Sequence, residues 1–210
     1  MAKFTRLLIG ACVAVVALAM VAGPALALRS IQISNPGAQS GTGVRVSFEE
    51  GGGFLRTVCE GLTLNGEGNE RIPKRKGATL GLITSGTTAG CRAFGLFAAT
   101  VRVEATREAP FTVKYESILG TLPIITGRLA LTSGVKFTIE AAGRTCRYAG
   151  EAGALWPVTR EARGELTIQE ANFLANPRAI VQEGSTRECP REGELRGTVR
   201  LERVRTIKLV

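Results

Sequence analysis

Four cysteines are the residues best able to do chemistry in this chain: Cys59, Cys91, Cys146 and Cys189. A nucleophilic thiolate needs a neighbouring base, and the chain has no histidine to supply one. A zinc site needs cysteines a few residues apart, whereas these four lie far from one another. An even cysteine count in an exported chain is typical of disulfides. Local loop closure favours Cys59–Cys91 and Cys146–Cys189, although the sequence alone does not choose among the possible pairings.

The acidic residues limit the catalytic possibilities further. All 18 are glutamate, so aspartate and histidine are both absent. This excludes Ser-His-Asp triads, aspartic dyads, histidine-based zinc sites and magnesium held by aspartate. Ser133 and Lys136 match the Ser-x-x-Lys motif of acyl-serine enzymes, but the companion motifs of those enzymes are missing. We therefore expect no catalytic, cofactor-binding or metal-binding residue.

The N-terminus has the layout of a secretory signal peptide. Lys3 and Arg6 precede an apolar run at 7–22, and Ala-Leu-Ala at 25–27 matches a cleavage site. We expect cleavage after residue 27, which removes a fifth cysteine and leaves 28–210 as a single secreted, extracellular domain. Retention of this segment as a membrane anchor is the alternative.

Alternation of apolar and polar residues is the main structural pattern of the remaining chain. It is typical of half-buried antiparallel strands and occurs at 44–48, 99–103, 111–115, 135–139, 166–168 and 195–201. Glycine-rich stretches separate these segments, and only the stretch ANFLA at 171–175 is compatible with a short helix. The pattern predicts an all-β fold: an antiparallel β-sandwich, or a partly open barrel, of roughly 9–11 strands with two disulfides.

One hairpin can be assigned a register from its sequence. The segment 128–140 (RLALTSGVKFTIE) contains a Ser-Gly pair in its middle. A three-residue loop at 132–134 would pair Leu131 with Val135 and place Gly134 in a left-handed conformation. We therefore expect a hairpin that turns at 132–134.

The chain is basic, with a formal net charge of +9. Its main charged feature is the run formed by Arg71, Lys74, Arg75 and Lys76. This run could contact a polyanion, or it could be a solvated loop between strands. It lacks the interleaved aromatic residues that stack on nucleic-acid bases, so we expect no specific nucleic-acid binding. Anionic cell-wall polymers are the partners that the charge favours.

Several stretches together carry a resemblance to known proteins. They are LTLNG after Cys59, KRKGATLGLITSG before Cys91, then PFTVKYESILGTLP, TCRYAG and ECPREGELRGTVRL. Their order resembles small secreted β-rich proteins of GC-rich actinobacteria that have no assigned activity. The resemblance covers roughly 44–202 and implies a disulfide-braced scaffold, with no catalytic residues.

We expect from these observations a secreted, non-enzymatic β-sandwich protein that binds anionic cell-envelope polymers. Two alternatives stay open: a glutamate-dependent glycan hydrolase and a secreted inhibitor-like ligand. A pocket with two glutamates about 5–9 Å apart would favour the hydrolase. A rigid exposed loop braced by a disulfide would favour the inhibitor.

Overall fold

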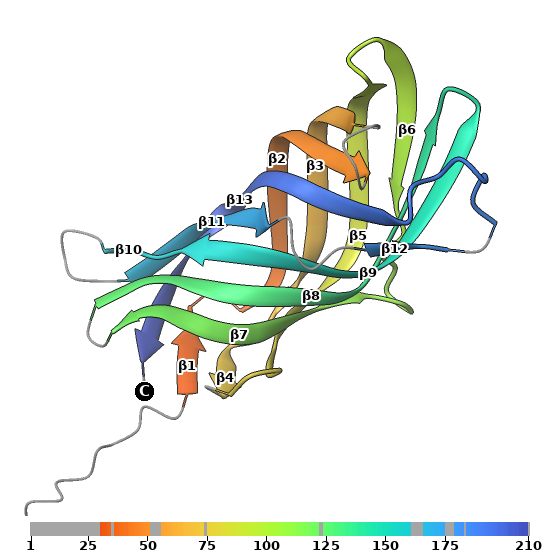
Figure 1. Ribbon diagram of the computed structural model, residues 1–210. Helices are drawn as coiled ribbons and strands as arrows, with labels where there is room; N and C mark the ends of the chain where they lie inside the picture. The colour runs from red at the N-terminus through yellow and green to blue at the C-terminus, as the bar shows by residue number, and fades with distance from the viewer. Residues whose placement is uncertain are drawn as a thin grey trace, which may run out of the picture.

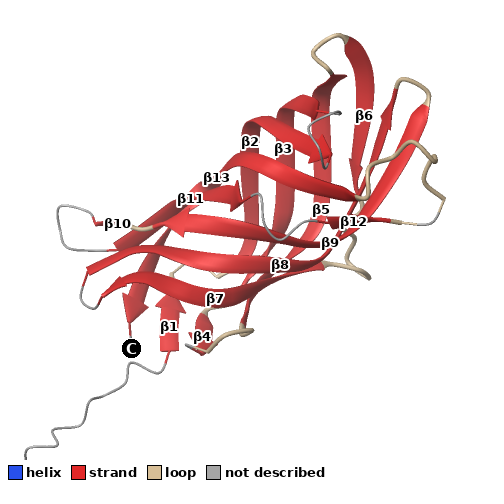
Figure 2. Cartoon of the chain, viewed as in Figure 1, coloured by secondary structure: helices blue, strands red, loops and turns tan. Residues whose placement is uncertain are grey.

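The alternating pattern forms strands along almost all of the chain that the structure describes. The computed structural model describes residues 30–34, 36–50, 56–73, 75–121, 124–160, 166–174, 179–182 and 184–209. The expected signal peptide and its cleavage site lie outside these residues. Figures 1 and 2 show strands joined by turns and loops, with no helix drawn. No helix in the described ranges is long and apolar enough to cross a membrane.

Thirteen strands of the described residues belong to one sheet. They are β1 (Ser30–Ile33), β2 (Gly37–Glu50), β3 (Arg56–Gly68), β4 (Arg71–Pro73), β5 (Thr79–Ala93), β6 (Phe97–Val103), β7 (Phe111–Thr121), β8 (Ile124–Ala141), β9 (Arg144–Pro157), β10 (Thr159–Arg160), β11 (Leu166–Leu174), β12 (Ala179–Val181) and β13 (Glu192–Leu209). The pairings between these strands are antiparallel, as the alternation predicts.

The sheet closes on itself as an eight-stranded barrel. Several barrel positions are shared by two consecutive strands: β6 and β7 both lie between β5 and β8, and β11 and β12 both lie between β9 and β13. Closure is made by β13, which pairs with β2 from Gly193↔Glu50 to Leu201↔Gly41. The expected sandwich is therefore not confirmed, and the barrel alternative fits. A meander whose first and last strands pair has no need of a second sheet to cover its apolar face.

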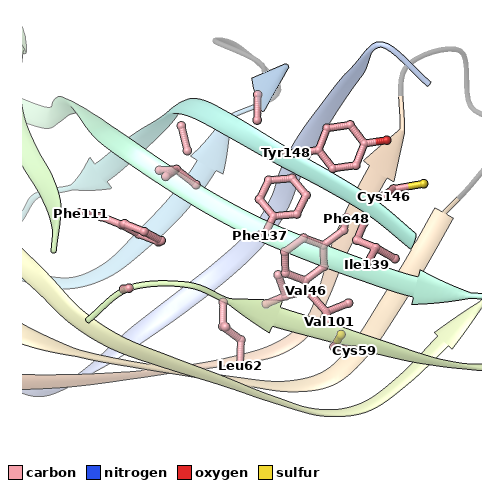
Figure 3. Close-up of a cluster of buried hydrophobic side chains, with 14 of the residues drawn as sticks. Val46, Phe48, Cys59, Leu62, Val101, Phe111, Phe137, Ile139, Cys146 and Tyr148 are labelled. Atoms are coloured by element: carbon pink, nitrogen blue, oxygen red, sulfur yellow. The ribbon is translucent and has the colours of Figure 1, made fainter. Parts of the chain in front are cut away.

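The upper half of the barrel is filled by side chains. We call the end with the β5–β6 turn the upper end, and the end with β1, β4 and the C-terminus of β13 the lower end (Figure 1). Phe137 lies between Phe48 and Tyr148, with ring centroids 5.3 and 5.2 Å apart, and aliphatic side chains surround the three rings (Figure 3). These rings occupy the interior that an eight-stranded barrel encloses. We call this cluster the upper core.

The predicted hairpin at 132–134 is wrong, because 124–141 is one continuous strand. β8 pairs with β7 on one side and with β9 on the other, and a β-bulge lies between Ser133 and Val135. Gly134 does adopt the expected left-handed conformation, with φ of 74°. The bulge changes which residues point inward, so Arg128, Ala130 and Thr132 are buried before it and Val135 and Phe137 after it.

Two smaller expectations also differ from the structure. The segment ANFLA lies mostly in β11 rather than in a helix, because β9 and β13 offer partners on both sides. Val44 is 75% exposed although its alternation suggested a buried residue. Arg45 has a φ of 55° and interrupts the alternation of β2. Gly43 points inward before this residue, and Val46 points inward after it.

Both predicted disulfides are confirmed. Cys59 of β3 bonds Cys91 of β5 directly across the sheet, and Cys146 of β9 bonds Cys189 in the loop before β13. The closed loops span sequence separations of 32 and 43 residues. Cys59 and Cys146 belong to the upper core, so both bonds brace the upper half of the barrel.

Removing the Cys146–Cys189 bond should lower the free energy of unfolding. The chain-entropy model gives about 4 kcal/mol for a loop of this length, because the unfolded chain gains freedom when the link is lost. Denaturant unfolding of a Cys146→Ala, Cys189→Ala double variant would measure the change against the unmodified protein. A change below about 1 kcal/mol would contradict the expected structural role.

Candidate functional site

The described residues of the basic run that the sequence singled out are exposed on a strand and the turn that follows it. Arg71 lies in β4 and Arg75 in the following turn, and both side chains are exposed. Lys76 is exposed too, and its Nζ forms an ion pair with Glu116 at 2.9 Å. The hydrogen bond and the charge of Glu116 raise the pKa of Lys76. Lys74 lies outside the described residues. The described part of the run therefore offers two exposed arginines and one lysine that is paired with Glu116.

A cavity of about 100 Å³ lies inside the barrel below the upper core. All eight barrel positions contribute to its wall, and β1 adds Ile33. Most of its lining is apolar, including Leu64, Leu80, Val113 and Phe173. A second buried cluster adjoins the cavity, because Ile33, Leu80 and Val113 belong to both, and we call this cluster the lower core. Its buried members are Ile33, Ile72, Ala78, Leu80, Val113, Tyr115, Ala130, Ile168 and Ile207.

Arg128 of β8 lines this interior cavity. It is on the inward phase of its strand, with Ala130 and Thr132, and only 3% of its surface is exposed. Its guanidinium lies over the ring of Trp156, with Cζ 5.1 Å from the ring centroid. Its Nε and Nη1 atoms are buried and have no hydrogen-bond partner. A buried, unpaired donor is costly, so this arrangement calls for an explanation.

Arg205 of β13 reaches the same cavity from across the barrel. It is 7% exposed, and its Nε is also buried without a partner. The guanidinium packs on Gly68 of β3 so closely that a Cβ at position 68 would collide with it. Glycine at this position thus gives the side chain room to lie against the wall.

Burial and mutual repulsion both disfavour the two charges. The pKa of Arg128 is lowered to about 10, mainly by burial and also by the charge of Arg205, while Tyr115 opposes the shift. Burial also lowers the pKa of Arg205. The pKa of Tyr115 is raised by burial, and the nearby charge of Arg128 partly counters this. At neutral pH both guanidiniums are charged and Tyr115 keeps its proton.

Neither arginine forms an ion pair with a carboxylate of the described residues. Elsewhere in this part of the chain arginines do have acidic partners: Arg196 binds Glu194 at 2.6 Å, and Arg102 lies 3.6 Å from Glu140. The arginines of both pairs are exposed to water, although Glu194 is buried. The two cations that most need a counter-charge are thus the buried ones, and they face a cavity instead.

Trp156 of β9 completes the set of donors. Its Nε1 is buried and has no hydrogen-bond partner. Arg128, Arg205 and Trp156 therefore present N–H groups at one cavity, and none of these groups can accept a hydrogen bond. The chemical complement of this arrangement is an anion that carries acceptor oxygens. We call Arg128, Arg205 and Trp156 the donor triad.

A shallow surface hollow of about 310 Å³ bears on the hydrolase alternative. Glu67 and Glu202 both line it, together with Arg107 and Arg203. Both glutamates are exposed to water, whereas the acid of a glycosidase pair needs a desolvated carboxyl group. The hollow brings two glutamates together without the environment that this reaction requires.

The upper end carries the rigid exposed turn that an inhibitor-like ligand would need. Phe94, Leu96 and Phe97 are exposed at the β5–β6 turn, and Cys91 anchors its base through the disulfide to β3. Phe94 has a positive φ of 54°, which is unusual for a bulky residue.

No group of three or more metal-ligating side chains occurs among the residues that the structure describes.

The donor triad was missed by sequence reasoning. Arg128 precedes Leu129 and Leu131, and the alternation suggested that these leucines were buried and the arginine exposed. The bulge at Ser133 reverses that assignment for the first half of β8. A usable signal was present in Trp156, because a lone tryptophan beside small residues on a strand suggests an interior position.

Replacing Arg128 by Met should stabilise the unliganded protein. The pKa of Arg128 is lower in the folded chain than in the unfolded one, so its charge destabilises the fold at all pH values below about 10. That penalty fades only as the pH rises above this value. At pH 7 the free energy of unfolding should rise by about 1–3 kcal/mol, reduced by the lost contact with Trp156.

Denaturant unfolding of Arg128→Met would measure this effect. Arg102→Met is the matched control, since Arg102 is an exposed strand residue, and its change should stay within about 0.5–1 kcal/mol. Destabilisation by Arg128→Met of more than about 1 kcal/mol would show that the guanidinium holds the fold together instead.

Comparison with known proteins leaves the assignment to the structure. No family model, no curated protein and no solved structure matches this chain. The resemblance to secreted actinobacterial β-rich proteins therefore stays a prediction, and the function has to be inferred from the barrel interior.

Proposed function

We propose that this chain is a non-enzymatic binding protein that holds a small anion inside its barrel. The observation that carries the proposal is the pair of buried guanidiniums, Arg128 and Arg205, which face one cavity and have no acidic partner in the described residues. An eight-stranded barrel is wide enough to enclose one small ligand. A bound anion would supply the missing counter-charge.

The electrostatics support tight positioning of such an anion. Two like charges held in a desolvated cavity repel each other, and a negative group between them converts that repulsion into attraction. Charge-assisted hydrogen bonds to guanidinium groups are among the strongest that proteins make. The donor triad is already in place, so binding requires little reorganisation of the wall.

The chemistry of the cavity supports binding rather than turnover. Guanidinium and indole groups keep their protons at neutral pH, so they can donate hydrogen bonds but cannot accept a proton from a substrate. Glu67 also lines the cavity, but it is an exposed residue and therefore lacks the desolvated setting of a general base. The hydrolase alternative has only the exposed pair Glu67 and Glu202, which lies in a surface hollow.

Export remains part of the proposal. The two disulfides indicate a non-reducing setting, which agrees with the secretory signal expected at 1–27. An exported binding protein could capture or protect a small anion outside the cell.

Anion binding can be tested by thermal unfolding at constant ionic strength. Formate, thiocyanate, 2-methylpropanoate and inorganic phosphate serve as probes. At least one probe should raise the unfolding midpoint of the protein saturably. At a probe concentration of one hundred times the Kd, the free energy of unfolding should be higher by about 2.7 kcal/mol. Arg205→Met should bind that probe at least about tenfold more weakly, because a charged hydrogen-bond donor is lost.

Two glycine variants provide a matched pair within β3. Gly68→Ala should also weaken binding, since the new Cβ displaces the Arg205 guanidinium. Gly61→Ala should not, because its Cβ would meet only the Cβ of Ala89, at 3.7 Å. Equal stabilisation of the unmodified protein, Arg205→Met and Gly68→Ala by every probe would refute binding inside the barrel.

We also propose surface binding to anionic cell-envelope polymers as a second function. Arg71 and Arg75 are exposed at the lower end, and exposed arginines such as Arg102 and Arg200 line the outer face. Contacts of this kind are weak and are screened by salt. They would concentrate the protein at an anionic wall without involving the cavity.

A pull-down on purified cell wall would check this second proposal. Retention at low salt should fall sharply at roughly 0.5 M salt, where charges are screened within a few ångströms. Arg71→Ala with Arg75→Ala should reduce retention. Lys76→Ala is the control with a smaller effect, because Glu116 already neutralises that lysine. Retention that is insensitive to both salt and the double variant would exclude this contact.

A further inference from the structure

We infer that the anion is a short monocarboxylate with a compact apolar body, held by its carboxylate between Arg128 and Arg205. This inference rests on the proposed anion-binding function and names the class of ligand. Three properties of the cavity carry it: the geometry of the donors, the chemistry of the remaining wall and the available volume.

The donors match the two oxygens of a carboxylate. Nε and Nη1 of Arg128 point to different edges of its guanidinium, so a carboxylate accepts a charge-assisted hydrogen bond from one of these edges. Nε of Arg205 and Nε1 of Trp156 are further donors for the same two oxygens. A carboxylate has about four lone-pair positions, so one such group can accept hydrogen bonds from Arg128, Arg205 and Trp156 together.

The rest of the wall selects an organic anion over an inorganic one. Leu64, Leu80, Val113, Phe173 and Val199 are among the apolar residues that make up most of the cavity wall. A phosphate or sulfate ion would turn some of its oxygens toward these apolar side chains, where no donor could replace the lost water. The alkyl body of a carboxylate would gain from burial against the same residues.

The volume limits that body to a few carbon atoms. The cavity measures about 100 Å³, and a smaller one of about 30 Å³ adjoins it, because both are lined by Leu64, Ile83, Thr132 and Phe173. For comparison, an apolar cavity of about 150 Å³ accommodates benzene. Above the cavities the rings of Phe48, Phe137 and Tyr148 fill the barrel, so an acyl chain cannot extend in that direction (Figure 3). On another side the cavity adjoins the surface hollow, with which it shares Gln39, Ser40 and Asn65, and the charged lining of that hollow would not favour an acyl chain.

The chain carries its own reporter for a direct test. Trp156 is the only tryptophan, and it lies against Arg128 in the donor triad. Its fluorescence would be followed while the intact protein is titrated with butanoate, butanamide, dodecanoate or inorganic phosphate. The titrations should reach about 10 mM, since ligands with so few atoms rarely bind below micromolar Kd.

Butanoate should change the fluorescence saturably and bind at least tenfold more tightly than the neutral butanamide, inorganic phosphate or dodecanoate. Ala154→Val places extra methyl groups at the cavity wall and leaves the donor triad intact. This variant should lose butanoate but keep formate, whose body is a single carbon. A thermal melt would establish that the variant is folded before the titrations are compared.

The possible results separate this inference from the proposal on which it depends. Preference for phosphate, or equal binding of butanoate and butanamide, would overturn the carboxylate assignment. The stability measurements on the Arg205 and Gly68 variants would then still decide whether the barrel binds an anion. Dodecanoate binding as tightly as butanoate would overturn the size limit. A lack of response to every anion, in fluorescence and in stability, would overturn both proposals.

Discussion

The pairing of β13 with β2 is the constraint on which the rest of this structure depends. It joins the two ends of the meander, removes both free edges and fixes the width of the interior. The seam requires small residues, because a Cβ at Gly41 would lie 2.7 Å from Val199 Cγ1 and one at Gly43 would crowd Val46. Once the width is fixed, every inward residue must either fill the interior or border a cavity. The upper core fills it with aromatic rings, whereas the level of Arg128 and Arg205 is left partly open.

The sequence predicted the parts of the fold that depend on local pattern and covalent chemistry. Strand alternation identified the all-β class, and local loop closure favoured the two disulfides that the structure contains. Closure into a barrel was only one of two alternatives, because it depends on residues 41–50 and 193–201 meeting across the whole chain. Bulges caused the remaining errors. A single extra residue reverses the inward phase of a strand, so the changes at Arg45 and Ser133 hid both the exposure of Val44 and the burial of Arg128.

The candidate site was hidden from sequence reasoning for a related reason. Arginine on a strand is normally an outward residue, and composition offers no means of telling an inward one from the twenty others in the chain. What distinguishes Arg128 and Arg205 is the coincidence of burial, missing partners and a shared cavity, and each of these depends on three-dimensional placement. The short basic run at 71–76 attracted attention because its charges are adjacent in sequence. The two arginines that share a cavity lie on strands β8 and β13, far apart in the chain.

The distribution of stabilising features along the barrel explains how such a site can be tolerated. Both disulfides and the stacked rings of Phe48, Phe137 and Tyr148 belong to the upper core. These features restrict the unfolded chain and bury apolar surface without involving the donor triad. The unpaired guanidiniums lie below them, where their desolvation reduces stability as long as no anion is bound. Because the contributions arise in different layers of one closed sheet, the upper half can offset the unfavourable charges of the lower half. A barrel without the upper core would depend on the cavity region for its stability. The simplest way to stabilise that region is to fill the cavity with apolar side chains, and this would remove the unpaired donors.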